Sequence, residues 1–181
     1  MRRSVLVSLM GLGLFQPLPA LASPKGWQDA SDVGAYALMT LSVGLPLAQK
    51  DKAGALQALG SFAATSAVTE GMKQSFPKLR PDGSDRKSFP SGHTSRSFAA
   101  AASLMNRQGP EIGVPAFIVA GFVGLARVEG KKHYWSDVAV GAALGTTLGF
   151  LITKDRPADK QTAFVPWADT QGGGFTFAAR F

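Results

Sequence analysis

The stretch "KSFPSGHTSRSF" runs from Lys87 to Phe98 and interrupts a chain made largely of long apolar segments. It contains one of the two histidines of the 181-residue sequence, His93, directly after a Pro-Ser-Gly turn. A polar turn with proline and glycine is typical of a surface connection. That interpretation accounts for the turn residues, but it gives no reason for the histidine.

The segments on either side of this stretch have the length and composition of helices. Proline and glycine between residues 77 and 92 predict an ordered loop there, and Thr94 or Ser95 is available to cap the helix that follows. We therefore predict an all-α fold, a compact helical bundle. The expected helices span residues 32–49, 53–76, 93–107, 112–128 and 136–154.

Composition narrows the classes of site that the chain can hold. It has no cysteine, which excludes a disulfide framework, thiolate catalysis and a Cys-based zinc site. The formal net charge is +7, and the stretch from Lys73 to Asp137 carries +5 of it. A concentrated positive charge favours an anionic partner such as a phosphate, a nucleic acid or a lipid headgroup.

The amino terminus has the layout of a secretory signal peptide over residues 1–22: two arginines, an apolar run, then small residues up to Ala22. Cleavage there predicts a mature chain that begins near Ser23 and lies in a bacterial periplasm. The alternative is an uncleaved anchor. Six apolar segments would then span the inner membrane with the basic residues on one side, in accord with the positive-inside tendency.

Helix lengths of about 14 to 18 apolar residues, below the roughly 20 that a span needs, favour a water-soluble or peripheral bundle over that alternative. Residues 23–161 are expected to form the helical domain. The tail, residues 162–181, alternates apolar and small residues with period two, which allows a short β-hairpin that covers the bundle.

The sequence contains three polar clusters, and two of them have the residues expected of an anion-binding site. Lys73 closes a predicted helix, and Arg80 follows in the loop after six intervening residues, so both cations can converge on one ligand. In "PSGH", Gly92 lets the backbone approach a ligand, and the N–H groups at the start of the next helix point towards an anion. The hydroxyl of Ser91 adds a donor.

The third cluster combines Arg127, His133 and Asp137. A histidine and an aspartate at i and i+4 share one face if the helix begins near His133. A carboxylate bonded to one ring nitrogen would fix the tautomer and leave the other nitrogen as nucleophile or base. Together the clusters provide cations, N–H donors and two histidines, which is what phosphoryl transfer through a covalent histidine requires.

In order and spacing the clusters resemble the signature of the type 2 phosphatidic acid phosphatase (PAP2) family, K-x6-RP, PSGH and SR-x5-H-x3-D. That family shares its fold with bacterial non-specific acid phosphatases and vanadium haloperoxidases. The resemblance covers roughly residues 55–153. Ala126 replaces the serine that the family usually has before its arginine, which removes a hydroxyl from the phosphate site.

The resemblance implies a phosphatase that forms a phosphohistidine and works without a metal or cofactor. Its nucleophile would be His133, oriented by Asp137, and its general acid would be His93. The phosphate-binding residues would be Lys73, Arg80, Ser91, Gly92 and Arg127.

Other functions fit the same residues less well. Vanadate resembles phosphate in shape and charge, so it could inhibit the enzyme or serve as the cofactor of a haloperoxidase. A non-catalytic phosphate- or lipid-binding protein is a second alternative. A nucleic-acid partner is not expected, because the sequence has no known binding module or aromatic-basic interleaving. The expected partner is a phosphate ester, either lipid or small and soluble, with membrane association in the lipid case.

Overall fold

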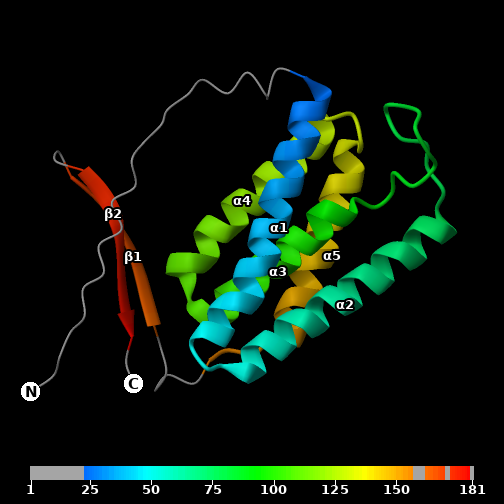
Figure 1. Ribbon diagram of the computed structural model, residues 1–181. Helices are drawn as coiled ribbons and strands as arrows, with labels where there is room; N and C mark the ends of the chain where they lie inside the picture. Colours follow the sequence, from blue (N-terminus) through cyan, green and yellow to red (C-terminus); the bar gives the residue numbers. More distant parts are fainter. Residues whose placement is uncertain (1–22, 157–161, 170–171, 180–181) are drawn as a thin grey trace, which may run out of the picture.

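The computed structural model describes residues 23–156, 162–169 and 172–179. In this part of the chain five helices form a bundle (Figure 1). They are α1 (Pro24–Ala48), α2 (Lys52–Ser75), α3 (Gly92–Gln108), α4 (Pro110–Glu129) and α5 (Trp135–Ile152). The predicted all-α helical bundle is confirmed, and each predicted helix is present.

The helix starts differ from the prediction. Helix α1 begins at Pro24, eight residues earlier than expected, because proline suits the first helical position and the Ser23 hydroxyl accepts from the Gly26 N–H at 3.1 Å. The predicted caps of the third helix are wrong. Ser91 occupies the N-cap position of α3, while Thr94 and Ser95 use their hydroxyls in other contacts.

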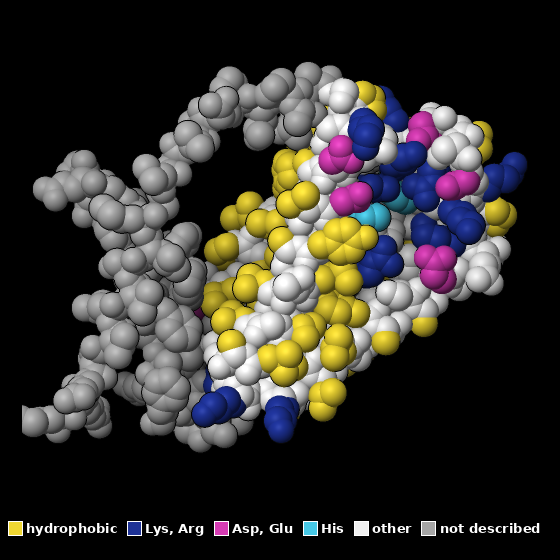
Figure 2. Space-filling view, viewed as in Figure 1, with side chains coloured by type: hydrophobic (Ala, Val, Ile, Leu, Met, Phe, Trp, Pro, Cys, Tyr) yellow, Lys and Arg dark blue, Asp and Glu magenta, His cyan; other side chains and the backbone are white. Residues whose placement is uncertain are grey.

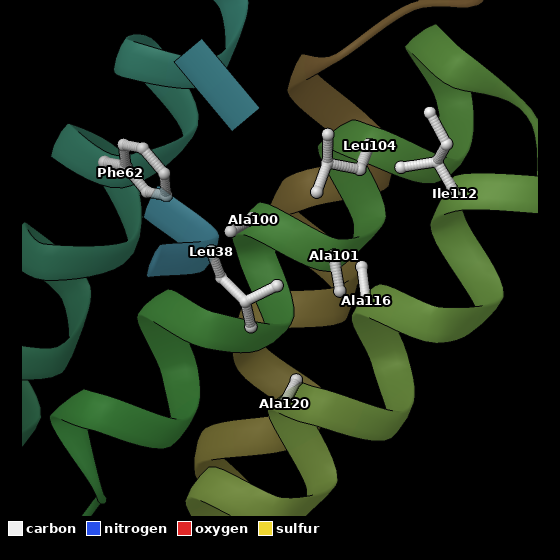
Figure 3. Packing of buried hydrophobic residues seen from close by; sticks show 8 residues of the cluster. All are labelled: Leu38, Phe62, Ala100, Ala101, Leu104, Ile112, Ala116 and Ala120. Carbon is white, nitrogen blue, oxygen red and sulfur yellow. The ribbon is translucent and has the colours of Figure 1, made fainter. Parts of the chain in front are cut away.

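Helix α3 lies at the centre of the bundle and packs against the other four helices. Its consecutive alanines, residues 99–102, have no measurable exposure, so neighbouring helices contact it on every side. Larger apolar side chains such as Leu38, Phe62 and Leu104 complete the core with Ile112 and several alanines (Figure 3). Small residues on the central helix therefore allow a tight five-helix bundle.

Helices α3 and α5 approach each other at glycines. A Cβ atom added to Gly145 would lie 2.0 Å from the Ser95 carbonyl oxygen, and one added to Gly141 would lie 2.7 Å from the Ser91 oxygen. Such distances leave no room for any side chain. The contact brings the amino-terminal ends of α3 and α5 side by side, with the Ser91 N–H donating to the Asp137 carbonyl oxygen at 3.0 Å.

The loop between α2 and α3 is ordered by its own backbone, as the sequence predicted. Lys78 and Lys87 form an isolated parallel bridge, and the Arg80 N–H donates to the Asp85 carbonyl at 3.0 Å. The Asp82 N–H donates to the carbonyl of Lys131, in the connection between α4 and α5. These bonds hold the loop against the ends of α3 and α5.

Beyond the bundle, β1 (Thr162–Asp169) and β2 (Gly172–Ala179) pair antiparallel, with Phe164 opposite Phe177. The proposed division at residue 161 and the covering role of this segment stay predictions. The predicted signal peptide, residues 1–22, lies outside the described residues. Helices α4 and α5 are long and apolar enough to cross a membrane, a test that the core helix of a soluble protein also passes.

Candidate active site

The predicted site residues come together at one end of the bundle, where Figure 2 shows the histidines among basic and acidic side chains. Lys73 closes α2, Ser91 to His93 begin α3, and Arg127 closes α4. His133 lies in the connection after α4, and Asp137 lies in the first turn of α5. Arg80 reaches the same place from the loop, since its Nη1 lies 3.4 Å from His133 Nε2.

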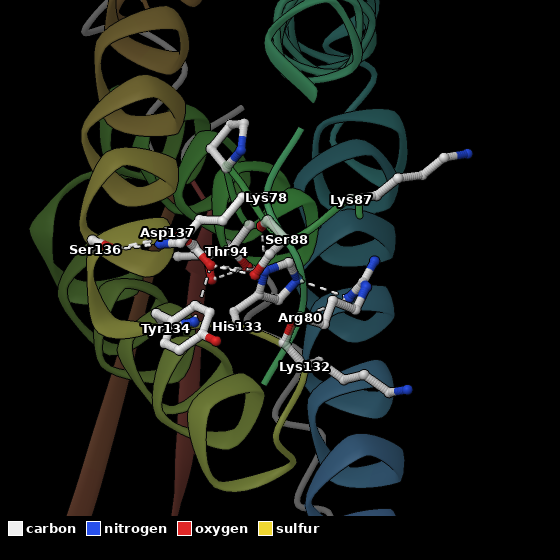
Figure 4. A network of polar contacts seen from close by, with 12 residues as sticks. Lys78, Arg80, Lys87, Ser88, Thr94, Lys132, His133, Tyr134, Ser136 and Asp137 are labelled. Atoms are coloured by element: carbon white, nitrogen blue, oxygen red, sulfur yellow. Dashed lines mark hydrogen bonds and ion pairs between the residues drawn. The ribbon is translucent and has the colours of Figure 1, made fainter. Parts of the chain in front are cut away.

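His133 is almost fully enclosed, at 2% exposure. Its Nδ1 lies 2.6 Å from the Ser88 carbonyl oxygen, which can only accept, so Nδ1 carries the proton (Figure 4). Burial, followed by the charges of Arg127 and Arg80, lowers the pKa of His133 to about 3. The imidazole is therefore neutral at physiological pH, with the Nε2 lone pair available beside the Arg80 guanidinium.

The expected bond between His133 and Asp137 is not the one that holds the ring. Their closest nitrogen and oxygen atoms are 3.8 Å apart. Helix α5 starts at Trp135, so His133 precedes the helix and the i, i+4 geometry predicted for a helical pair does not apply. The Ser88 carbonyl is the hydrogen-bond partner of Nδ1, and Asp137 lies within ion-pair distance of the same atom, so its predicted role in orienting the ring stays a prediction.

Asp137 is fully buried, and its carboxylate accepts hydrogen bonds from groups beside the His133 ring. Its carboxylate accepts from Lys78 Nζ at 2.6 Å, from the Ser88 hydroxyl and from the Tyr134 N–H at 3.0 Å (Figure 4). Because Ser88 also provides the carbonyl that holds His133, Asp137 fixes the segment that orients the histidine. Sequence reasoning missed Ser88 and Lys78, although both lie within or close to the stretches that it singled out.

The cationic side chains of the site differ in the hydrogen bonds that they make within the protein. Lys73 Nζ donates to the carbonyls of Lys87 and Pro90, at 2.7 and 2.6 Å, so it also fixes the loop. Burial, followed by the charge of Arg80, lowers the pKa of Lys73 to about 8. Arg127 is 7% exposed and its Nη1 donates to the Ser31 hydroxyl at 3.1 Å. Its Nε is buried without a hydrogen-bond partner among the described residues.

A buried guanidinium N–H without a partner is costly and is a sign that a ligand completes the site. The start of α3 is also consistent with a ligand at this site. Gly92 has no positive φ and an added Cβ would meet only ordinary contacts, the nearest at 3.5 Å, so packing does not require glycine there. Ser91 is fully buried, and its hydroxyl lies 2.8 Å from that of Thr94.

His93 lies at the edge of the site, and its Nε2 is 2.9 Å from Asp32 of α1. Burial, followed by the charge of Arg127, lowers the pKa of His93 to about 4. No group of three or more residues able to ligate a metal occurs in the described ranges. The arrangement brings two imidazoles and several cationic side chains around one position, which suits a tetrahedral oxyanion.

The family model of the PAP2 superfamily matches residues 54–161. A lipid A 1-phosphatase of Porphyromonas gingivalis is 43% identical over 82 residues, which are 44% of this chain and 18% of that protein. The chain thus spans less than a fifth of the length of that curated relative.

Two solved structures share the fold. One is LpxE of Aquifex aeolicus, with a TM-score of 0.62 at 23% identity over 76% of this chain and 87% of the other. The other is a transmembrane PAP2-type phosphatidylglycerolphosphate phosphatase of Bacillus subtilis, with a TM-score of 0.59 at 21% identity over 77% of each chain. With its family-model match over more than half of its length, the chain belongs to the PAP2 superfamily.

Proposed function

We propose that this chain is a phosphatase that hydrolyses lipid phosphate monoesters through a phosphohistidine on His133. The observation that supports it most is the state of that imidazole. Nδ1 is held by the Ser88 carbonyl, and Nε2 faces the guanidinium of Arg80 at 3.4 Å. A neutral ring with one nitrogen anchored and the other beside a cation is a nucleophile placed at an anion site.

In the first half of the proposed reaction, His133 Nε2 forms a bond to phosphorus as the bond to the leaving oxygen breaks. His93 gives its proton to that oxygen, and the product alcohol departs. In the second half, water attacks the phosphohistidine, His93 takes a proton from the water, and inorganic phosphate leaves. The balance requires no metal, oxidant or second substrate.

The proposed binding residues would stabilise the charge on the transferred group. Arg80 and Arg127 offer N–H groups to its oxygens, and the Nε of Arg127 would gain the partner that it lacks. The Gly92 N–H at the start of α3 and the Ser91 hydroxyl are further donors, while Lys73 contributes charge from behind the loop. Asp137 takes the role of fixing Ser88 and, through it, the nucleophile.

A lipid substrate is favoured by the surface beside the site. Large apolar side chains are exposed on the outer faces of α1 and α4, among them Tyr36, Leu41, Ile118 and Phe122. Figure 2 shows such side chains below the charged end of the bundle. A phosphate headgroup at the site would leave its apolar tail against this flank. The name of the P. gingivalis relative, a lipid A 1-phosphatase, is consistent with that substrate class.

We also propose that the chain acts at a bacterial membrane from the periplasmic side. The apolar character of α4 and α5 supports the membrane. The periplasmic side rests on the sequence of residues 1–22 alone.

The proposal is tested by assaying phosphate release from phosphatidic acid in detergent micelles and from p-nitrophenyl phosphate. His133→Ala should reduce the rate by about 10³-fold or more, because it removes the group that accepts the phosphoryl. Lys154→Gln, an exposed change after α5, is the control and should keep the wild-type rate. Retained turnover in His133→Ala would refute the mechanism, and halide oxidation with added vanadate in place of hydrolysis would identify a haloperoxidase.

A further inference from the structure

Helix α1 contributes an acidic side chain to the site that the family match does not include. That match starts at residue 54, whereas Asp32 lies in the third turn of α1. Its Oδ1 is 2.9 Å from His93 Nε2 and 3.5 Å from Arg127 Nη1. One carboxylate oxygen therefore contacts both the imidazole of the proposed general acid and a guanidinium of the phosphate site.

The position of Asp32 is fixed by its neighbours on α1. The hydroxyl of Ser31 donates to the Gln28 carbonyl at 2.7 Å and accepts from Arg127 Nη1 at 3.1 Å. The Gln28 amide in turn donates to the Gly130 carbonyl at 2.8 Å, in the connection that leads to His133. These contacts tie the amino-terminal turns of α1 to the site, so Asp32 is held where it meets His93.

The groups around His93 act on the affinity of its ring for a proton in opposite directions. Three cations face it, namely Arg127 from α4, Arg96 from α3 and Arg80 from the loop, and each one lowers its pKa. Burial has the largest effect in the same direction, whereas the negative charge of Asp32 raises the pKa. A general acid must carry its proton before the leaving oxygen can receive it.

We propose that Asp32 is a positioning residue that orients His93 and strengthens its binding of the proton that it donates to the leaving oxygen of the substrate. This role rests on the proposed phosphatase function. When the P–O bond breaks, His93 passes its proton to the departing alkoxide and becomes neutral. The water that attacks the phosphohistidine returns a proton to it. Asp32 accepts the hydrogen bond from His93 Nε2.

The first measurement does not depend on activity. The chain has only two histidines, so NMR of ¹⁵N-labelled imidazoles can follow the titration of each ring in the full-length protein. Asp32→Asn keeps the shape of the side chain but removes its charge, and the titration of His93 should move to lower pH. Asp29→Asn, on the same helix and in an ion pair with the exposed Lys25, is the matched control and should leave the His93 titration unmoved.

The second measurement compares leaving groups. A simple alkyl phosphate has a basic leaving oxygen that needs the acid, whereas the nitrophenolate of p-nitrophenyl phosphate leaves readily without one. In Asp32→Asn, kcat on the alkyl ester should fall about tenfold and kcat on the aryl ester less than about threefold, since general acid catalysis contributes about 10²–10⁴-fold. Asp32→Glu, which keeps a carboxylate, should restore part of the loss.

An unchanged His93 titration in Asp32→Asn would overturn the proposal, as would equal losses on both esters, which indicate a purely structural role. If the wild-type protein hydrolysed neither ester, the phosphatase function would be refuted. The role proposed for Asp32 would then be refuted as well. Hydrolysis by the wild type, together with equal losses on both esters in Asp32→Asn, would refute the positioning role of Asp32 and leave the phosphatase function standing.

Discussion

The two imidazoles of the site lie in surroundings that oppose their charge. His133 is enclosed by the loop and faces the guanidinium of Arg80, and His93 lies between arginines and the carboxylate of Asp32. Burial is the largest cause of the lowered pKa in both. A neutral ring suits the nucleophile, whereas a general acid must bind a proton before it reacts, and the negative charge of Asp32 favours that protonated form of His93.

These lowered values make folding stability depend on pH. The pKa is about 3 for His133 and about 4 for His93, against an ordinary 6.5 in the unfolded chain. Between those values the unfolded chain binds more protons, so the free energy of unfolding falls as the pH is lowered from about 6.5 to about 5. His133→Gln removes one of the two groups and should about halve that slope, measured by urea unfolding at several pH values.

The wild-type slope should approach two protons, or about 2.7 kcal/mol per pH unit at most. Carboxylates titrate mainly below this window and contribute little to it. A slope in His133→Gln equal to that of the wild type would show that the His133 ring is not held neutral.

At the residue scale, the sequence predicted the residues that carry their own motif and missed those that do not. His93, His133 and the three cations stand at recognisable spacings, and they meet at one end of the bundle. Asp32 is 61 positions from His93, and only the packing of α1 against α3 and α4 brings it there. The carbonyl of Ser88 could not be foreseen either, because any residue type provides one.

At the scale of elements, the contact between α3 and α5 aligns the site. The first turns of these helices carry His93 and Asp137, and the glycines of α5 set how closely they approach. Gly145→Ala would place a methyl group 2.0 Å from the Ser95 carbonyl oxygen, so the helices must separate. We expect a loss of about 2 kcal/mol in the free energy of unfolding and a higher KM.

The matched control is Gly121→Ala in α4, where an added Cβ meets nothing within 4 Å. It should stabilise the protein by up to about 1 kcal/mol, because alanine loses less entropy in a helix. Urea unfolding and steady-state kinetics of both variants make the comparison. Equal stability changes in the two variants would contradict the close approach of α3 and α5.

Helix count and order were predictable because apolar runs separated by proline and glycine determine them. The ends were less predictable. Helix α1 starts at Pro24 because of a short-range cap by Ser23, whereas the apolar pattern alone predicts a start at residue 32. Thr94 and Ser95 have side chains suitable for capping, but their hydroxyls contact Ser91 and Thr69 in the packed interior. Tertiary contacts therefore determine whether such a hydroxyl caps a helix or bonds elsewhere.

At the scale of the whole molecule, the bundle separates a charged end from an apolar flank (Figure 2). Loop, helix ends and connection meet at the charged end, where segments from Asp32 to Asp137 surround one position. The charge of +7 and the apolar surface of α1 and α4 suit a substrate with an anionic head and an apolar tail. The chemical consequence that we propose for this arrangement is transfer of a phosphoryl group to His133.

That transfer is tested most directly by trapping the intermediate. The protein is mixed with p-nitrophenyl phosphate, quenched in alkali, where phosphohistidine survives, and its peptides are analysed by mass spectrometry. We predict phosphate on His133 in the wild type and none in His133→Ala. Steady turnover with no covalent phosphate, or with phosphate on another residue, would contradict the account.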